Sequence, residues 1–154
     1  MNQSTDTLQI RPATGSDIGA LVGLLARLFA QEADFAPDAA KQERGLRLIL
    51  EQPAVGRIYC AVAGDVVVGM VSLLFTVSTA EGGRAAWLED MVVHPDWRGQ
   101  GIGARLLQEA IRQARVAGCC RITLLTDAGN VAAQEFYGRA GFARSAMVPL
   151  RLEL

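Results

Sequence analysis

A glycine-rich segment in the C-terminal half of the chain carries residue types suited to holding a phosphate group. It reads VHPDWRGQGIGARLL over residues 93–107, where a β-branched run gives way to glycines and then to an amphipathic pattern. The first N–H groups of a helix lack partners inside the helix, and Gly99, Gly101 and Gly103 would allow the positive φ angles and the close approach that aim those groups at one phosphate. Arg98 can add a charge-assisted contact. The segment predicts an anion site for a nucleotide-like cofactor, although a tight strand-to-helix connection without a ligand has the same pattern.

The glycine spacing narrows the class of nucleotide. The segment is not GxxxxGK[ST], because the Lys and Ser/Thr are missing, and it is not GxGxxG, because the glycines fall as G-x-G-x-G. ATP and NAD are therefore disfavoured. His94 is the only histidine and the three cysteines form no CxxC pair, so no structural metal site is expected.

The elements that must position this segment follow from hydrophobic periodicity and turn residues. Helical spacing predicts a long helix from Ile102 to about Gly118, and β-branched alternation predicts a strand just before the glycines. The full set of expected elements is strand 8–11, helices 18–30 and 38–52, strands 57–63, 66–75 and 85–93, helix 102–118, strand 121–126, helix 131–139 and extended chain over 142–154 with a break at Pro149.

Length and composition bound the class of protein. The 154 residues suit one domain, and 51% hydrophobic with 20% charged residues favour a globular core over disorder. A net charge of −1 gives no global attraction to nucleic acid or to an anionic membrane. An odd number of cysteines, with no signal peptide or apolar run of membrane-spanning length, predicts a reducing, cytoplasmic location.

Two motifs in register resemble the GNAT N-acetyltransferase superfamily. Arg98-x-x-Gly101-x-Gly103 is similar to its acetyl-coenzyme A (acetyl-CoA) signature, and Asn130-x-x-Ala133-x-x-Phe136-Tyr137 is similar to its second motif. The order of expected elements over residues 8–154 agrees. The resemblance implies an α/β (α+β) fold, with a mixed, largely antiparallel central sheet flanked by about four helices, as one N-acetyltransferase domain over residues 1–154.

The resemblance also implies where acetyl-CoA binds. The strand before the glycines would pair through its backbone with the pantetheine arm, which requires that strand and strand 121–126 to splay apart. Asn130 is expected to cap its helix, with direct cofactor contact as the alternative. The residues implied for the cofactor are Met91, Val92, Val93, Arg98, Gly99, Gln100, Gly101, Ile102, Gly103, Ala104, Asn130 and Tyr137.

Two residues are implied in the chemistry. Tyr137 would protonate or hydrogen-bond the departing sulfur, and its alternative role is packing beside Phe136. Glu89 would accept the amine proton, on the same strand face as Trp87 and Met91, and its alternative role is a structural carboxylate. The adjacent Asp90 would point to the opposite face unless a bulge intervenes.

The predicted function is transfer of acetyl from acetyl-CoA to a primary amine of a small molecule or peptide, by direct attack in a ternary complex. The alternative is a non-catalytic acyl-CoA-binding sensor or regulatory module. Acidic residues at Glu32, Asp34 and Glu81 would favour a cationic acceptor, or would serve only solubility. No nucleic acid or membrane partner is expected. The apolar segment AMVPLRLEL at the C-terminus is the expected edge of a homodimer.

Overall fold

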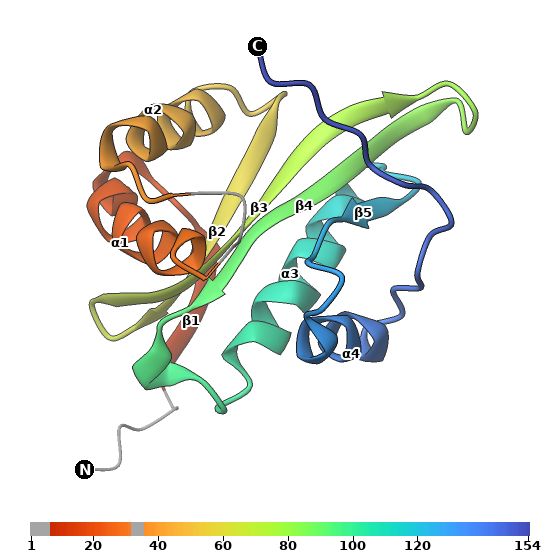
Figure 1. Cartoon of the computed structure of the whole chain (residues 1–154). Helices are drawn as coiled ribbons and strands as arrows, with labels where there is room; N and C mark the ends of the chain where they lie inside the picture. The colour runs from red at the N-terminus through yellow and green to blue at the C-terminus, as the bar shows by residue number, and fades with distance from the viewer. Residues whose placement is uncertain (1–6, 32–35) are drawn as a thin grey trace.

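The computed structural model describes residues 7–31 and 36–154 (Figure 1). The strands are β1 (Leu8–Pro12), β2 (Gly56–Ala63), β3 (Val66–Ser78), β4 (Gly83–Val93) and β5 (Ile122–Leu124). The helices are α1 (Ile18–Phe29), α2 (Ala39–Leu50), α3 (Ile102–Val116) and α4 (Val131–Arg139). Short 3-10 turns at Gly15–Asp17 and Pro95–Trp97 precede α1 and follow β4.

The sheet has the strand order β1-β2-β3-β4-β5. Neighbouring strands are antiparallel except β4 and β5, which are parallel. Helices α1 and α2 lie on one face of the sheet and α3 lies on the other, with α4 beside it (Figure 1). The expected mixed, largely antiparallel sheet with four helices is confirmed.

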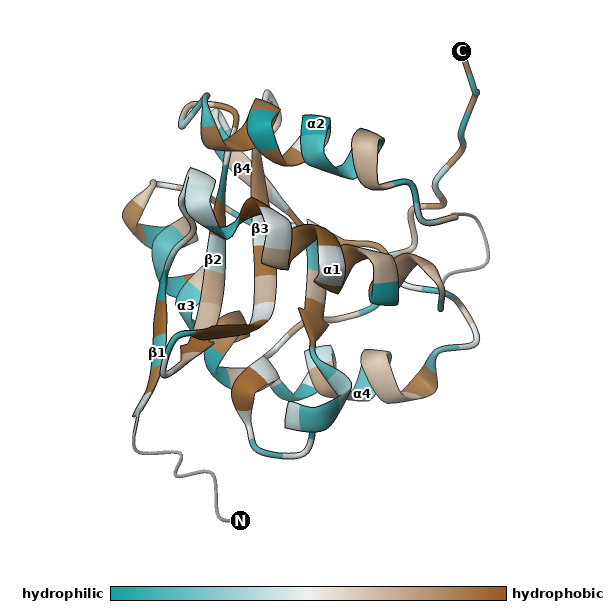
Figure 2. Cartoon of the chain, turned by 90° about the vertical axis from the view of Figure 1, so that its left-hand side faces the viewer, coloured by the Kyte–Doolittle hydropathy of each residue, from teal (hydrophilic) through white to brown (hydrophobic). Residues whose placement is uncertain are grey.

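Each face of the sheet buries its own hydrophobic cluster. Leu21, Leu25 and Leu46 of α1 and α2 pack with Met70 and Val92 on one face. On the other face, the α3 side chains Leu106, Leu107 and Ala110 pack with β-strand residues. Figure 2 shows α1 as mostly hydrophobic, whereas α2 alternates between hydrophobic and hydrophilic turns, as expected for a helix with one face in water.

An ion pair between Arg11 and Asp17 links β1 to the start of α1. Arg11 donates to both carboxylate oxygens of Asp17, at 2.8 and 2.9 Å, and the Thr14 N–H donates to the same carboxylate at 2.7 Å. The Asp17 side chain is only 7% exposed. Its hydrogen bonds with Arg11 lower the pKa of Asp17 to about 2. The first helix is therefore held to the edge strand by a buried, paired carboxylate.

The C-terminal part of the chain differs from the sequence expectation. Within residues 36–154, no strand follows β5, and β5 itself covers three residues instead of 121–126. The segment 142–154 belongs to no sheet, so the last strand implied by the family's order of elements is absent from the described residues. Alternating apolar residues form a strand only against a neighbouring edge, and here the segment lies against none.

Candidate functional site

The glycine turn between β4 and α3 leaves helix N–H groups open. Gly99 and Gly101 have φ angles of +77° and +79°, and Gly101 is the helix cap without a side-chain cap. The first helical bond runs from the Arg105 N–H to the Gly101 carbonyl, so residues 102–104 have N–H groups without intrahelical partners. This arrangement can hold an anion.

The other residues of the turn contribute in different ways. Gln100 and Ala104 are exposed, whereas Ile102 buries its side chain in the core and offers only its backbone. The Arg98 Nε donates to the Val93 carbonyl at 3.2 Å, which ties the turn to the end of β4. Only Gly99 and Gly101 have the positive φ expected of these glycines, because Gly103 lies inside the first turn of α3.

The edge of β4 next to this turn is free of β5. The parallel pairing covers only Ala86–Leu88 of β4, against Ile122–Leu124 of β5. The expected splay of the two strands is therefore present from residue 89 to residue 93. Because the His94 N–H donates to the Val68 carbonyl, Val93 and Met91 direct their backbone groups away from β3 and toward this edge. Val92 between them pairs with Met70 and buries its side chain on the α1 face.

A β-bulge at Asp90 changes which residues share a face. Ser72 pairs with Glu89 and Met70 pairs with Val92, so β4 has one residue more than β3 between these pairs. Asp90 has a φ of +53° and is the only described non-glycine residue with a positive φ. The expectation that Met91 shares the Glu89 face was wrong, because the bulge turns Met91 to the α3 side, where it packs at the edge of that core.

Glu89 and Trp87 lie on the face covered by α1 and α2. Their partners Ser72 and Leu74 are on β3, and a Cβ built on Gly56 would meet both Leu74 and Ile49 of α2. Directly paired residues share a face, so Glu89 and Trp87 point toward the α2 side. Both are exposed, and a molecule reaching the free β4 edge from this side would meet the Glu89 carboxylate.

Phe136, the residue before Tyr137 on α4, lies next to the glycine turn, and it brings Tyr137 close to that turn. A Cβ built on Gly103 would be 3.5 Å from the Phe136 ring and 3.8 Å from Val93, so α4, α3 and β4 meet at this point. The Tyr137 ring packs edge-on against Phe136 and Phe142, with centroid distances of 5.0 and 5.7 Å. Burial raises the pKa of Tyr137 to about 12. Among the described residues, no group hydrogen-bonds to its hydroxyl, which leaves the phenol able to donate to a ligand.

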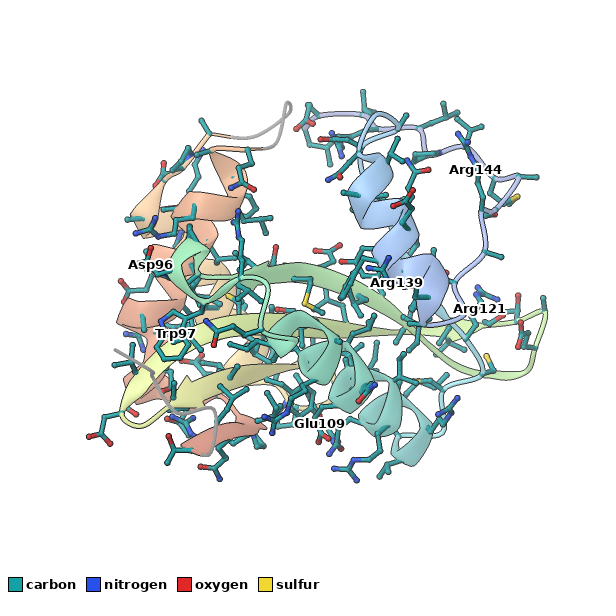
Figure 3. All side chains as sticks on the ribbon, turned by 90° about the horizontal axis from the view of Figure 1, so that it is seen from below. Asp96, Trp97, Glu109, Arg121, Arg139 and Arg144 are labelled. Atoms are coloured by element: carbon teal, nitrogen blue, oxygen red, sulfur yellow. The ribbon has the colours of Figure 1, made fainter. Side chains whose placement is uncertain are left out.

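Two other polar residues have local structural roles. The Asn130 side chain accepts a hydrogen bond from the Ala133 N–H at 3.1 Å, which confirms the expected cap of α4. The His94 Nδ1 accepts one from the Asp96 N–H at 3.2 Å and caps the 3-10 turn that leads to the glycines. Figure 3 shows Asp96 and Trp97 at this end of α3, and Arg121 beyond the other end.

Several expected residues do not join the site. Glu32 and Asp34 lie outside the described residues, and Glu81 is paired with Arg121 at 3.3 Å. Cys60 is buried, whereas Cys119 and Cys120 follow the far end of α3. Over residues 7–31 and 36–154, no cluster of His, Cys, Asp or Glu could hold a metal ion. None of the helices in these ranges is long and apolar enough to cross a bilayer.

The sequence left a bulge at Glu89 and Asp90 open as an alternative, and the structure contains it. Its positive φ falls on Asp90, a residue type that tolerates the left-handed region better than most. Two adjacent acids in an otherwise apolar strand were the available signal. The contact of Phe136 with Gly103 had no sequence signal, because it joins two helices that are distant in the chain.

Comparisons with known proteins agree with this geometry. Residues 24–142 match the acetyltransferase (GNAT) family. The chain is 31% identical over 137 residues to aminoalkylphosphonate N-acetyltransferase of Salmonella typhimurium, covering 89% of this chain and 86% of the relative.

Solved structures have the same fold. An integron cassette protein from the mobile metagenome of Cole Harbour Salt Marsh has a TM-score of 0.83 and 31% identity, covering 95% of this chain and 90% of that one. A predicted acetyltransferase from Clostridium acetobutylicum, crystallised with acetyl-CoA, has a TM-score of 0.78 and 20% identity, covering 95% and 96%.

Proposed function

The chain belongs to the GNAT acetyltransferase family and is an N-acetyltransferase, and we propose that it moves acetyl from acetyl-CoA to a primary amine of a small molecule or peptide. The observation that carries this proposal is the free edge of β4, which leads directly into the uncapped N-terminus of α3. The unpaired backbone groups of β4 suit the amide groups of an acetyl donor, and the N-terminus of α3 suits its phosphates, so a long acetyl donor fits along both.

The residues present suit acetyl-CoA, which supplies an activated acetyl thioester when bound. The N–H groups of residues 102–104 and the Arg98 guanidinium would hold the pyrophosphate. Met91 and Val93 would pair through their backbone with the pantetheine amides, with Val92 as the spacer between them. Asn130 would act mainly by fixing the start of α4, which brings Tyr137 to the turn.

The acceptor amine would enter on the α2 side of β4. An alkyl ammonium has a pKa of about 10.4, so it must lose a proton before it can attack. Glu89 is the exposed carboxylate on this face and would accept that proton, directly or through water. After the C–N bond forms, the nitrogen loses its second proton to water and the C–S bond breaks. Tyr137 would hydrogen-bond the departing sulfur, or give it the phenolic proton and regain one from solvent.

Direct transfer in a ternary complex fits the positions of the cysteines. Cys60 is buried beneath Arg11, and Cys119 and Cys120 lie at the end of α3 opposite the glycine turn. None of the three is placed to take the acetyl group at the β4 edge. The name of the Salmonella relative supports a small-molecule amine as acceptor. We further propose one domain over residues 1–154, a cytoplasmic location, a homodimer, and no nucleic acid or membrane partner.

A panel of primary amines tests the proposal. Purified protein is mixed with acetyl-CoA and each amine, and free thiol release is followed with a colorimetric reagent. We expect release with at least one amine class, and formation of its N-acetyl product by mass spectrometry. Tight acetyl-CoA binding with no release for any primary amine would overturn the proposed acceptor class, and would favour a sensor.

A further inference from the structure

Ser72 lies in the middle of β3 and buries its hydroxyl. It is 0% exposed, and among the described residues no group hydrogen-bonds to its Oγ. A buried hydroxyl without a partner costs free energy, because it has lost its hydrogen bonds to water. Folded proteins keep few such groups, so each one needs an explanation.

The neighbours of Ser72 on its face of the sheet leave one polar group for the hydroxyl. Ser72 pairs with Ile58 of β2 on one side and with Glu89 of β4 on the other. Along β3, the residues that share its face are Met70 and Leu74. Helices α1 and α2 cover this face with a hydrophobic cluster (Figure 1). Of the four neighbours within the sheet, only Glu89 has a polar side chain.

The Glu89 carboxylate is within reach of this hydroxyl and is free to turn toward it. Directly paired residues of antiparallel strands have Cβ atoms about 4.5–5.5 Å apart, a gap that the longer Glu side chain can bridge. Glu89 is exposed, and over residues 7–31 and 36–154 its carboxylate has no hydrogen-bond or ion-pair partner. Rotation about its side-chain bonds can therefore bring one carboxylate oxygen to the Ser72 Oγ.

The pair of Ser72 and Glu89 lies at the point where β4 changes its neighbours. It is the last regular pair before the bulge, because the register shifts between Met70 and Ser72. The pairing of β4 with β5 also ends one residue earlier, at Leu88. Glu89 is therefore the first residue of the free β4 edge along which the proposed acetyl donor would lie.

We propose that Ser72 is a positioning residue for Glu89, and that its hydroxyl donates a hydrogen bond to the Glu89 carboxylate when an amine occupies the site. An exposed Glu side chain samples several rotamers, and a hydrogen bond to one carboxylate oxygen selects the orientation that leaves the other oxygen for the amine. Ser72 is buried and touches neither substrate, so its effect on the rate passes through Glu89. This inference rests on the proposed function, because it needs Glu89 as the base.

Ser72→Ala removes the hydroxyl and little else. We expect kcat with the most reactive amine to fall by about 10- to 100-fold, the effect of one hydrogen bond to a charged group, while the KM of acetyl-CoA changes by less than about twofold. The urea midpoint of unfolding should stay the same or rise, because the variant no longer buries an unpaired hydroxyl. A fall in that midpoint would show that the hydroxyl has a structural partner, and would overturn the inference.

Ser78→Ala is the matched control on the same face of β3. The Ser78 hydroxyl is also buried, but it accepts hydrogen bonds from the Arg121 guanidinium at 3.2 Å and from the Glu81 N–H at 3.3 Å. Its removal should lower the urea midpoint and leave kcat unchanged, the reverse of the result for Ser72→Ala. An equal loss of kcat in both variants would overturn the specific role of Ser72.

A double-mutant cycle tests whether the effect passes through Glu89. Ser72→Ala combined with Glu89→Gln should have the kcat of Glu89→Gln alone, within about twofold. The full Ser72→Ala loss in the Glu89→Gln background, or no loss in the wild-type background, would overturn this inference and leave the proposed function standing. A Glu89→Gln enzyme with the wild-type rate, or no transfer to any amine, would instead overturn the assigned base or the proposed function itself, and this inference with it. The two kinds of failure are therefore distinguishable.

Discussion

At the scale of single residues, the environment of Tyr137 decides what its phenol can do. Packing against Phe136 and Phe142 buries the ring, and burial raises its pKa to about 12. The phenol is therefore protonated at neutral pH. It is a stable hydrogen-bond donor to a thiolate, and it is too weak an acid to lose its proton completely without help from the site.

Tyr137→Phe keeps the ring contacts and removes only the hydroxyl. We expect kcat to fall by about 10²–10⁴, with the Kd of acetyl-CoA nearly unchanged. Steady-state kinetics and calorimetry measure the two quantities separately. Tyr59→Phe is the matched control, because Tyr59 is the only other tyrosine and is buried in the core. Full activity of Tyr137→Phe would show that water or a backbone group serves the sulfur.

Glu89→Gln removes a carboxylate while keeping the size of the side chain. If Glu89 accepts the amine proton, the rate should fall most at low pH. It should recover partly as the pH rises toward the pKa of the amine, because more of the amine is then already unprotonated. The measurement is kcat/KM from pH 6 to 9. Glu51→Gln, at the exposed end of α2, is the control carboxylate. A Glu89→Gln enzyme with the wild-type profile would end the assignment of Glu89 as base.

At the scale of elements, glycine substitutions can distinguish the contribution of the turn to acetyl-CoA binding from that of the helix that follows it. Gly101 needs its φ of +79°, whereas Gly103 is helical and has ordinary space for a Cβ beside Phe136. Gly101→Val should weaken acetyl-CoA binding by about tenfold or more, and Gly103→Ala by less than about threefold. Calorimetric titration with acetyl-CoA measures both.

Gly118 provides the matched control for this comparison. It has a φ of +78° and lies just beyond the other end of α3. Gly118→Ala should cost stability for the same backbone reason, about 1–2 kcal/mol, without changing the Kd of acetyl-CoA. Equal loss of affinity in the Gly118 and Gly101 variants would show that backbone strain alone, and not phosphate binding, explains the effect.

The link between β1 and α1 predicts a pH-dependent stability. The pKa of Asp17 falls from 3.8 to about 2 on folding, so its contribution is present above pH 4 and is lost as the pH falls toward 2. Asp17→Asn should lower the free energy of unfolding at neutral pH by about 2 kcal/mol and flatten its loss between pH 4 and 2. Urea melts across this range measure it, with the exposed Asp65→Asn as control.

Elements with strong local signals were predictable from the sequence. The bounds of α4 agree with those expected, because Asn130 caps its start and Gly141 follows its end. The free edge of β4 was expected only through the family resemblance. The short β5, the bulge at Asp90 and the lack of a strand over residues 142–154 depend on which strands meet in space, and the local sequence does not determine this.

At the scale of the whole molecule, the glycine turn and a second surface groove lie at opposite ends of α3. The glycine turn precedes Ile102, whereas the groove is lined by Arg115 in the last turn of the helix and by Arg121 beyond it (Figure 3). Phe142 connects them, because it lines the groove and packs against Tyr137.

The proposed homodimer would make thermal stability depend on protein concentration. Unfolding of a dimer releases two chains, so dilution favours the unfolded state. A tenfold rise in concentration adds about 1.4 kcal/mol per dimer, which corresponds to a Tm increase of about 2 °C for two chains of this length. Differential scanning calorimetry between about 1 and 100 μM measures this shift. A wild-type Tm that does not change with protein concentration would contradict the proposed homodimer.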